Sequence, residues 1–156
     1  MARRKTALGF SLVELVIVIV IIGVIAAIAV PRISRGARGA TDSALRGDLA
    51  ALRNAVDLYA AEHNGNFPVA ATFVAQIAAQ TDITGAVGTD FGPYLRAIPG
   101  LPVAGQATLT GGNVGDNGVD AADGAGVGWL YTVATGDIVA NTGTAADDDG
   151  TAYNTY

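Results

Sequence analysis

A long apolar segment near the N-terminus contains a single carboxylate. The segment runs from Leu8 to Val30, and Glu14 is its one charged residue. About 20 apolar residues are enough for a helix to cross the hydrocarbon core of a bilayer, which is about 30 Å thick. A charged residue at the centre of such a helix costs about 3 kcal/mol, and somewhat less nearer the end. We therefore expect Glu14 to have a function and a partner that offsets this cost.

Two general classes of N-terminal segment share this length. A secretory signal peptide is cleaved after its apolar region, and the small residues within 26–29 would allow such cleavage. A plain single-span anchor also fits, because Arg3, Arg4 and Lys5 would hold its N-terminus in the cytoplasm. Neither class accounts for Glu14.

The residues around this acid resemble the processing signal of type IV pilins and type II secretion pseudopilins. In that family a short basic leader ends in Gly, and the mature chain begins with Phe and carries Glu at its fifth position. Here the leader is residues 1–9, Gly9 ends it, and Phe10 would be the new N-terminus. The resemblance implies that a prepilin peptidase cleaves between Gly9 and Phe10 and methylates the new amine. It also implies that Glu14 faces the Phe10 amine of a neighbouring subunit in a filament.

The resemblance further implies a location and a set of partners. The precursor would cross the inner membrane once, with its N-terminus in the cytoplasm and its head in the periplasm. It would then enter a periplasmic or surface filament. The expected partners are further copies in a homo-oligomeric filament, the prepilin peptidase, the inner-membrane assembly platform and the minor pseudopilins.

A second helical pattern follows the membrane segment. Its apolar residues advance by four and three positions, which places them on one face of an amphipathic helix: Leu45, Leu49, Leu52, Val56 and Tyr59. Asn64 and Gly65 tolerate left-handed backbone geometry and are expected to end the helix. The sequence therefore predicts one helix from about Phe10 to His63, with an apolar stripe that needs a partner.

Gly23 and Pro31 are the weak points of this helix. Glycine lowers helix stability by about 1 kcal/mol relative to alanine, and proline removes a backbone hydrogen bond. One interpretation is simple tolerance, because membrane helices often contain both residues. The family resemblance implies instead that the segment between them unwinds when subunits assemble.

The remaining residues, 65–156, are predicted to form a small acidic head. Residues 129–133 and 137–140, with a glycine-containing turn between them, read as a β-hairpin with Trp129 in the core and Tyr131 on the surface. Residues 72–80 read as a short helix with Phe73, Val74 and Ile77 turned inward, and residues 106–110 as a possible strand. The predicted fold class is α+β and pilin-like. Its long N-terminal helix is transmembrane over residues 10–30, amphipathic over 31–64, and packed against a small antiparallel β-sheet.

Composition narrows the possible functions of the head. Beyond Gly65 the only base is Arg96, set against many aspartates, so direct binding of nucleic acid is not expected. No phosphate loop, catalytic triad or paired-carboxylate site stands out in the sequence, so we do not expect an enzyme. The single histidine, His63, falls at the predicted helix end, where a cation interacts favourably with the helix dipole.

A loop in the acidic half could bind calcium. Its oxygen-bearing side chains are those of Asp116, Asn117, Asp120 and Asp123, and calcium takes six to eight oxygen ligands. The G-type pseudopilins are known as a group for calcium in a C-terminal loop, so the resemblance favours this interpretation. The alternative is an acidic loop that is simply solvated. Residues 147–149 could add further calcium ligands, but three adjacent acids more often stay solvated.

Several later segments resemble the G-type major pseudopilins in particular: residues 58–68, 92–99 and 128–138. The chain has no cysteine, and these pseudopilins typically lack the C-terminal disulfide of many type IV pilins. The sequence therefore favours the major pseudopilin of a type II secretion system, which helps to export folded proteins. A type IV pilus subunit for adhesion, motility or DNA uptake is the alternative, and a membrane-tethered binding module is a more distant one.

Overall fold

The computed structural model describes residues 10–103, 114–143, 145–147 and 149–156, with the backbone alone for residues 30–35. It divides into two compact units, one up to Ala37 and the other from Arg38 onward. The leader with Gly9, and the possible strand at residues 106–110, lie outside the described residues.

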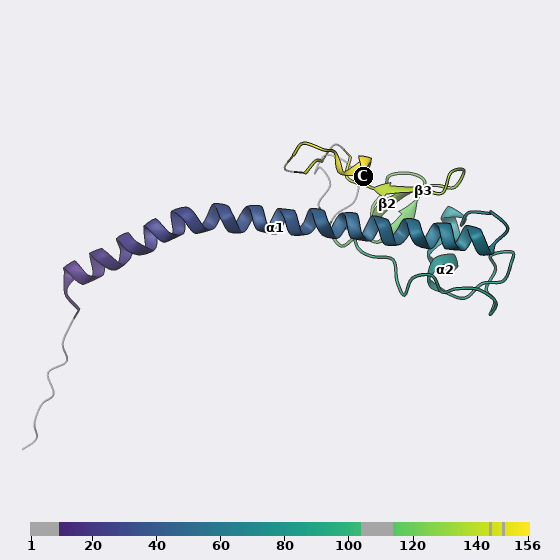
Figure 1. The fold of residues 1–156 in the computed structure, drawn as a ribbon, viewed down its shortest axis with the longest axis horizontal. Helices are drawn as coiled ribbons and strands as arrows, with labels where there is room; N and C mark the ends of the chain where they lie inside the picture. Colours follow the sequence, from purple (N-terminus) through teal and green to yellow (C-terminus); the bar gives the residue numbers. More distant parts are fainter. Residues whose placement is uncertain (1–9, 104–113, 144, 148) are drawn as a thin grey trace, which may run out of the picture. The chain divides into compact units, whose positions relative to one another are not determined.

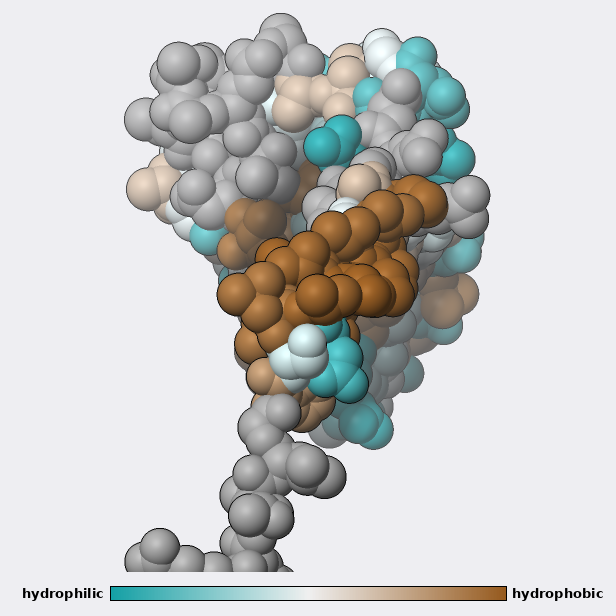
Figure 2. Space-filling model, turned by 90° about the vertical axis from the view of Figure 1, so that its left-hand side faces the viewer, coloured by the Kyte–Doolittle hydropathy of each residue, from teal (hydrophilic) through white to brown (hydrophobic). Residues whose placement is uncertain are grey.

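A single helix, α1, runs from Leu12 to Glu62 over 51 residues and confirms the predicted long helix. Its first part contains the one described segment that is long and apolar enough to cross a membrane, Leu12–Ala29, and none of that segment is buried within the chain. Figure 2 shows its apolar side chains gathered into one continuous hydrophobic surface. These side chains find no cover in their own chain, so they require lipid or other apolar helices around them.

The second part of α1 buries the predicted stripe. All five stripe residues are at most 2% exposed: Leu45, Leu49, Leu52, Val56 and Tyr59. The helix then ends as expected, because Asn64 and Gly65 both have positive φ, at 57° and 81°. The Gly65 N–H donates to the Ala60 carbonyl at 2.8 Å, which satisfies one of the last helical acceptors.

The sheet has three strands in the order β1-β2-β3: β1 at Gly118–Asp120, β2 at Val127–Thr132 and β3 at Asp137–Ala140. β2 and β3 are antiparallel and form the predicted hairpin. Its turn is closed by the Gly136 N–H, which donates to the Thr132 carbonyl at 2.9 Å.

The sheet is mixed rather than wholly antiparallel, because β1 pairs with β2 in parallel. Parallel neighbours usually need a connection of a dozen or more residues. Here residues 121–126 are enough, since β1 has only three residues. The backbones at Gly118 and Gly126 approach so closely that a Cβ at Gly118 would lie 2.4 Å from the Gly126 carbonyl oxygen. Glycine at position 118 therefore permits the pairing.

The short helix α2 spans Phe73–Ala78 and follows a 3-10 turn, η1, at Ala70–Thr72. Phe73 and Ile77 are buried as predicted, but Val74 is 50% exposed, so its predicted inward position is wrong. Gln76 takes the inward position instead. Its side chain accepts the Val69 N–H at 2.7 Å and donates to the Gly85 carbonyl at 3.1 Å, which offsets the burial of its amide.

One hydrophobic core joins the stripe of α1 to β2 and β3, which lie beside the C-terminal part of the helix (Figure 1). Trp129 and Tyr131 are both buried, so the predicted surface position of Tyr131 is wrong. Residues two apart in a strand share a face, and both side chains therefore point to the core. The Tyr131 hydroxyl donates to the Pro68 carbonyl at 3.1 Å, which satisfies its one buried polar group.

Replacing Leu52 with alanine tests the dependence of the head on this stripe. Leu52 is fully buried, and we expect Leu52→Ala to lower the free energy of unfolding by about 3 kcal/mol. Leu58 on the same helix is 51% exposed, and Leu58→Ala should change it by less than about 0.5 kcal/mol. Chemical denaturation of the full chain in detergent micelles, followed by the fluorescence of the single tryptophan, would measure both. Equal losses would contradict the role of the stripe.

Candidate filament-assembly site and acidic loops

Glu14 lies in the first turn of α1 and contacts the start of its own helix. The Ser11 N–H donates to Glu14 Oε2 at 3.1 Å, and the Leu15 N–H donates to the Ser11 carbonyl at 3.2 Å. Ser11 immediately precedes the helix and Glu14 is its third residue, so this is the glutamate half of a capping box. The spacing of Ser11 and Glu14 in the sequence is the signal for this contact, and sequence reasoning missed it.

The capping contact accounts for only part of the cost of Glu14. A carboxylate at a helix N-terminus gains about 0.3–1 kcal/mol from the helix dipole at exposed sites. The cost of a charge in a membrane helix is about 3 kcal/mol at the centre, and less toward the end. Phe10, two residues before the helix, is 79% exposed. The side chains that follow it in the first part of α1 are also exposed. Glu14 is itself exposed, so within the described residues its carboxylate is open to a second, positively charged partner.

Gly23 and Pro31 both lie within the helical part of α1. A Cβ added at Gly23 would meet no atom within 4 Å, so the single chain gives no steric reason for glycine there. The backbone is helical through Pro31, although proline has no N–H to donate to the preceding turn. The unwinding of the intervening segment remains a prediction about the assembled state.

The four candidate calcium ligands lie in and around β1. The Asp116 carbonyl accepts the Leu101 N–H at 2.8 Å, and Asp120 Oδ1 accepts the Ala121 N–H at 2.6 Å. Asp123 Oδ1 accepts the Asn141 side-chain amide at 2.9 Å. Within the described residues, no three His, Cys, Asp or Glu side chains come together as a metal site. Calcium binding by Asp116, Asn117, Asp120 and Asp123 therefore remains a prediction.

A calcium titration tests this prediction directly. If the loop binds calcium, millimolar calcium should raise the melting temperature of the full chain, because a ligand that binds only the folded state stabilises it. Asp120→Asn should reduce that rise, since Asp120 is exposed and accepts the N–H of the adjacent Ala121, so the change removes a charge with little effect on the fold. Asp137→Asn, an exposed acid at the start of β3, is the matched control and should leave the rise intact. No rise in the unmutated chain would leave the loop as a solvated acidic segment.

The acid at position 147 has a structural role that sequence reasoning missed. Its side chain is only 4% exposed and forms an ion pair with Arg46 at 3.4 Å. It also accepts hydrogen bonds from the Tyr156 hydroxyl and from the N–H groups of Asp149 and Thr151. These bonds, that of Tyr156 first, hold the pKa of Asp147 below its usual value. Its contribution to stability is therefore present at neutral pH and is lost as the pH falls.

Asp147 organises a C-terminal strap, residues 145–147 and 149–156, on the surface of α1. The Arg46 guanidinium lies 4.5 Å from the centroid of the Tyr156 ring and donates to its hydroxyl at 2.9 Å. Arg53 donates to the carbonyls of Ile138 and Tyr156. Both arginines of α1 thus hold the strap, and Arg53 also binds β3.

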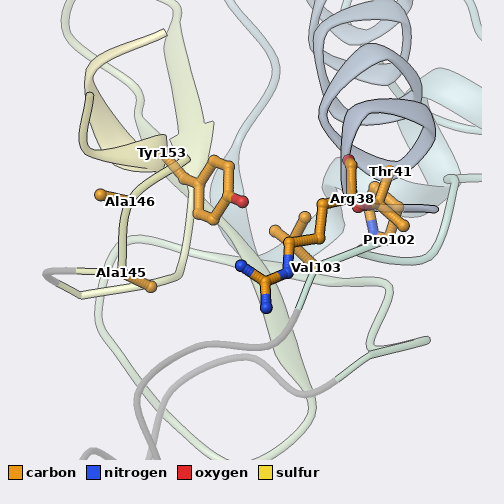
Figure 3. Close-up of a pocket in the computed structure, with 7 residues that line it drawn as sticks. All are labelled: Arg38, Thr41, Pro102, Val103, Ala145, Ala146 and Tyr153. Atoms are coloured by element: carbon orange, nitrogen blue, oxygen red, sulfur yellow. Dashed lines mark hydrogen bonds between the residues drawn. The ribbon is translucent and has the colours of Figure 1, made fainter. Parts of the chain in front are cut away.

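A cleft of about 410 Å³ lies beside the strap, lined by residues of α1, the strap and Pro102 and Val103 (Figure 3). The Tyr153 hydroxyl donates to Asp42 Oδ1 at 2.7 Å, and burial together with this bond raises the pKa of Tyr153 to about 12. The Thr41 hydroxyl donates to the Arg38 carbonyl at 2.7 Å. Both hydroxyl groups of the lining are thus used by the fold.

Comparison with known families bears on the N-terminal site alone. Residues 4–30 match the family model described as the prokaryotic N-terminal methylation motif. This match supports a type IV pilin-like protein, and with it a structural subunit rather than an enzyme. The methylation motif and the exposed apolar helix together fit membrane anchoring. No curated protein and no solved structure matches the chain at a significant level.

Proposed function

We propose that this protein is the structural subunit of a pilus-like filament, and specifically the major pseudopilin of a type II secretion system. The observation that carries the proposal is the position of Glu14 inside the methylation motif, five residues after Gly9 and on an apolar helix that its own chain leaves uncovered. The motif supports the pilin-like part. The choice of secretion system rests on the resemblance of residues 58–68, 92–99 and 128–138 and on the absence of cysteine.

In the proposed pathway the chain is made as an inner-membrane precursor. A prepilin peptidase cleaves between Gly9 and Phe10 and methylates the Phe10 amine. The new amine lies one residue before Ser11, so it sits near the positive end of the helix dipole of its own chain. A carboxylate from a neighbouring subunit relieves that unfavourable position. Assembly thus exchanges the contact between Glu14 and the Ser11 N–H for an ion pair between two subunits.

The magnitudes indicate what such a pair contributes. Unit charges about 4 Å apart at an effective dielectric constant of about 20 attract by about 4 kcal/mol. Removing both charges from water costs a comparable amount, so the net gain is small. The pair would therefore set the register between subunits, while the apolar surface of Leu12–Ala29 supplies the association.

The mass of the N-terminal peptide and the assembly of Glu14 variants test the filament proposal. Protein recovered from its own membranes should begin at N-methylated Phe10. Glu14→Ala should insert and be cleaved but fail to assemble, whereas Val13→Ala, an exposed neighbour, should assemble. Glu14→Gln keeps an oxygen that can accept the Ser11 N–H but removes the charge, and we expect it to fail as well.

Two outcomes would contradict this proposal. Normal assembly of Glu14→Gln would make the capping contact, and not an ion pair, the role of the side chain. An intact Met1 or Ala2 terminus, with Glu14→Ala fully active, would favour a membrane-tethered binding module.

A deletion strain distinguishes the two filament systems. We expect loss of secreted enzymes, with adhesion and twitching unchanged, because the proposed filament drives protein export. Restoration of secretion by the unmutated gene, but not by a Glu14→Ala copy, would link the loss to assembly. The reverse pattern, with secretion intact and adhesion, motility or DNA uptake lost, would identify a type IV pilus subunit.

A further inference from the structure

Two arginines follow the apolar span of α1 directly. The span covers Leu12–Ala29, and Arg32 and Arg35 are the first charged residues after it. The backbone of α1 stays helical through both positions, and both belong to the first compact unit, which ends at Ala37. The filament proposal gives these two bases no role.

Their distance from the span places both arginines at the depth of lipid phosphates. A helix rises about 1.5 Å per residue, so the 18 residues of the span cover about 27 Å, close to the thickness of a hydrocarbon core of about 30 Å. Arg32 and Arg35 then lie about 4.5 Å and about 9 Å beyond Ala29 along the helix axis. The headgroup layer on each side of the core is about 5–8 Å thick. The two positions therefore fall within this layer and at its outer edge.

The two positions also share one flank of the helix. Residues three apart in an α-helix lie about 60° from each other around the axis and are neighbours on its surface. Arginine has a long apolar stem and a planar charged group, which binds a phosphate through two parallel hydrogen bonds. Two arginines on one flank can therefore bind the phosphates of neighbouring lipids at one point of the bilayer surface.

The sequence gives neither arginine an acidic partner on its own helix. Ion pairs along a helix form between residues three or four apart. The residues at these distances from Arg32 and Arg35 include no acid, and none occurs between Glu14 and Asp42. Arg38 differs, because Asp42 lies four positions after it and because it lines the cleft beside the strap. A counter-charge for Arg32 and Arg35 would have to come from elsewhere.

The place of these two bases also runs against their general distribution around membrane helices. Bases within about 15–20 residues of a span favour the cytoplasmic side, and Arg3, Arg4 and Lys5 supply that bias at the other end. Arg32 and Arg35 reduce the bias, since they lie at the end that would face away from the cytoplasm. A favourable contact at that surface would offset this cost.

We propose that Arg32 and Arg35 bind the phosphates of anionic lipids at the membrane surface where α1 leaves the bilayer. The pair fixes the depth of the helix before assembly. Glu14 lies 18 positions before Arg32, about 27 Å along the helix. Its carboxylate is then held near the opposite edge of the core, where a charge costs less than at the centre. This inference rests on the membrane span of the proposed function and not on filament formation.

The acidic head of a second copy is the other partner that charge alone would allow. Lipid is favoured because it surrounds the span of every membrane-bound copy, at the depth of the two arginines, before any subunits meet. Each base near an anionic surface strengthens the association about fivefold, so the pair should contribute about 25-fold. Phosphatidylcholine carries a cation that compensates its phosphate and phosphatidylglycerol does not, so the preference between these two lipids measures the contact.

Lipid retention by the full chain tests the proposal. The chain would be reconstituted in nanodiscs with equal amounts of phosphatidylglycerol and phosphatidylcholine, and native mass spectrometry would count the lipids that stay on the released protein. The unmutated chain should prefer phosphatidylglycerol. Arg32→Gln and Arg35→Gln should each reduce this preference about fivefold, and the double variant about 25-fold. Arg96→Gln, the same change at an exposed base of the head, is the matched control and should leave it unchanged.

The leader bases need a separate control, because they can attract anionic lipid at the other membrane surface. Replacing Arg3, Arg4 and Lys5 together with glutamine should lower the total preference. The further loss caused by the double variant should have the same size in this background, since distant sites act additively. Disappearance of that further loss would place the anionic lipid at the leader and overturn the proposal.

The remaining outcomes separate this inference from the proposed function. An unchanged lipid preference in the inserted double variant would overturn the inference alone. If that variant instead lost salt-sensitive cross-links between copies, the two arginines would belong to a contact with the acidic head of a neighbour. A chain that failed to enter the nanodiscs would overturn the membrane span of the proposed function, and the lipid contact with it.

Discussion

The head of this protein depends on one face of one helix. The sheet has strands of three, six and four residues, and such a sheet is not stable alone in water. The buried stripe of α1 supplies the wall against which Trp129, Tyr131 and Ile138 pack. Each of these side chains contributes about 1.5–3 kcal/mol only when another surface covers it. The head therefore cannot be separated from the second part of α1.

The same helix faces two different environments along its length. Up to Ala29 its apolar side chains are exposed all around, whereas from Leu45 only one stripe is apolar and that stripe is covered. Arg46 and Arg53 lie in this second part of the helix. They hold the strap through Asp147 and Tyr156, and Arg53 also donates to the Ile138 carbonyl in β3. The polar contacts of the second part of α1 thus close the head. The first part of α1 remains free to bury its apolar surface against other molecules.

Features that depend on local periodicity could be predicted from the sequence. The stripe, the helix end at Asn64 and Gly65, and the β2–β3 hairpin all follow from spacing within a short window. The parallel pairing of β1 could not, because it depends on a close approach of Gly118 and Gly126 that no periodicity marks. The predicted positions of Val74 and Tyr131 were wrong for a simpler reason. Tyr131 is two residues from Trp129 and so shares its face of β2, and Gln76 rather than Val74 lies with Phe73 and Ile77 on the buried face of α2.

Long-range polar contacts were the least predictable part. Asp147 lies in a run of three acids that resembles a solvated loop, yet its carboxylate is enclosed by Arg46 and Tyr156. The burial of His63 depends likewise on a loop that begins 17 positions later at Gln80. The candidate calcium ligands illustrate the converse. Their residue types suggested a shared metal ion, yet among the described residues no three acidic or other metal-binding side chains come together.

Two features of the N-terminal part have no complete explanation within a single chain. Within the described residues Glu14 accepts a backbone N–H and forms no ion pair, and Gly23 has open space where a larger side chain would fit. A monomeric anchor would be more stable with leucine at the first position and alanine at the second, because both changes favour an apolar helix. Retaining an acid and a flexible point within the same helix carries a cost that assembly would offset. In a filament of the proposed kind, the acid would fix the register and the glycine would allow the helix to adjust to its neighbours.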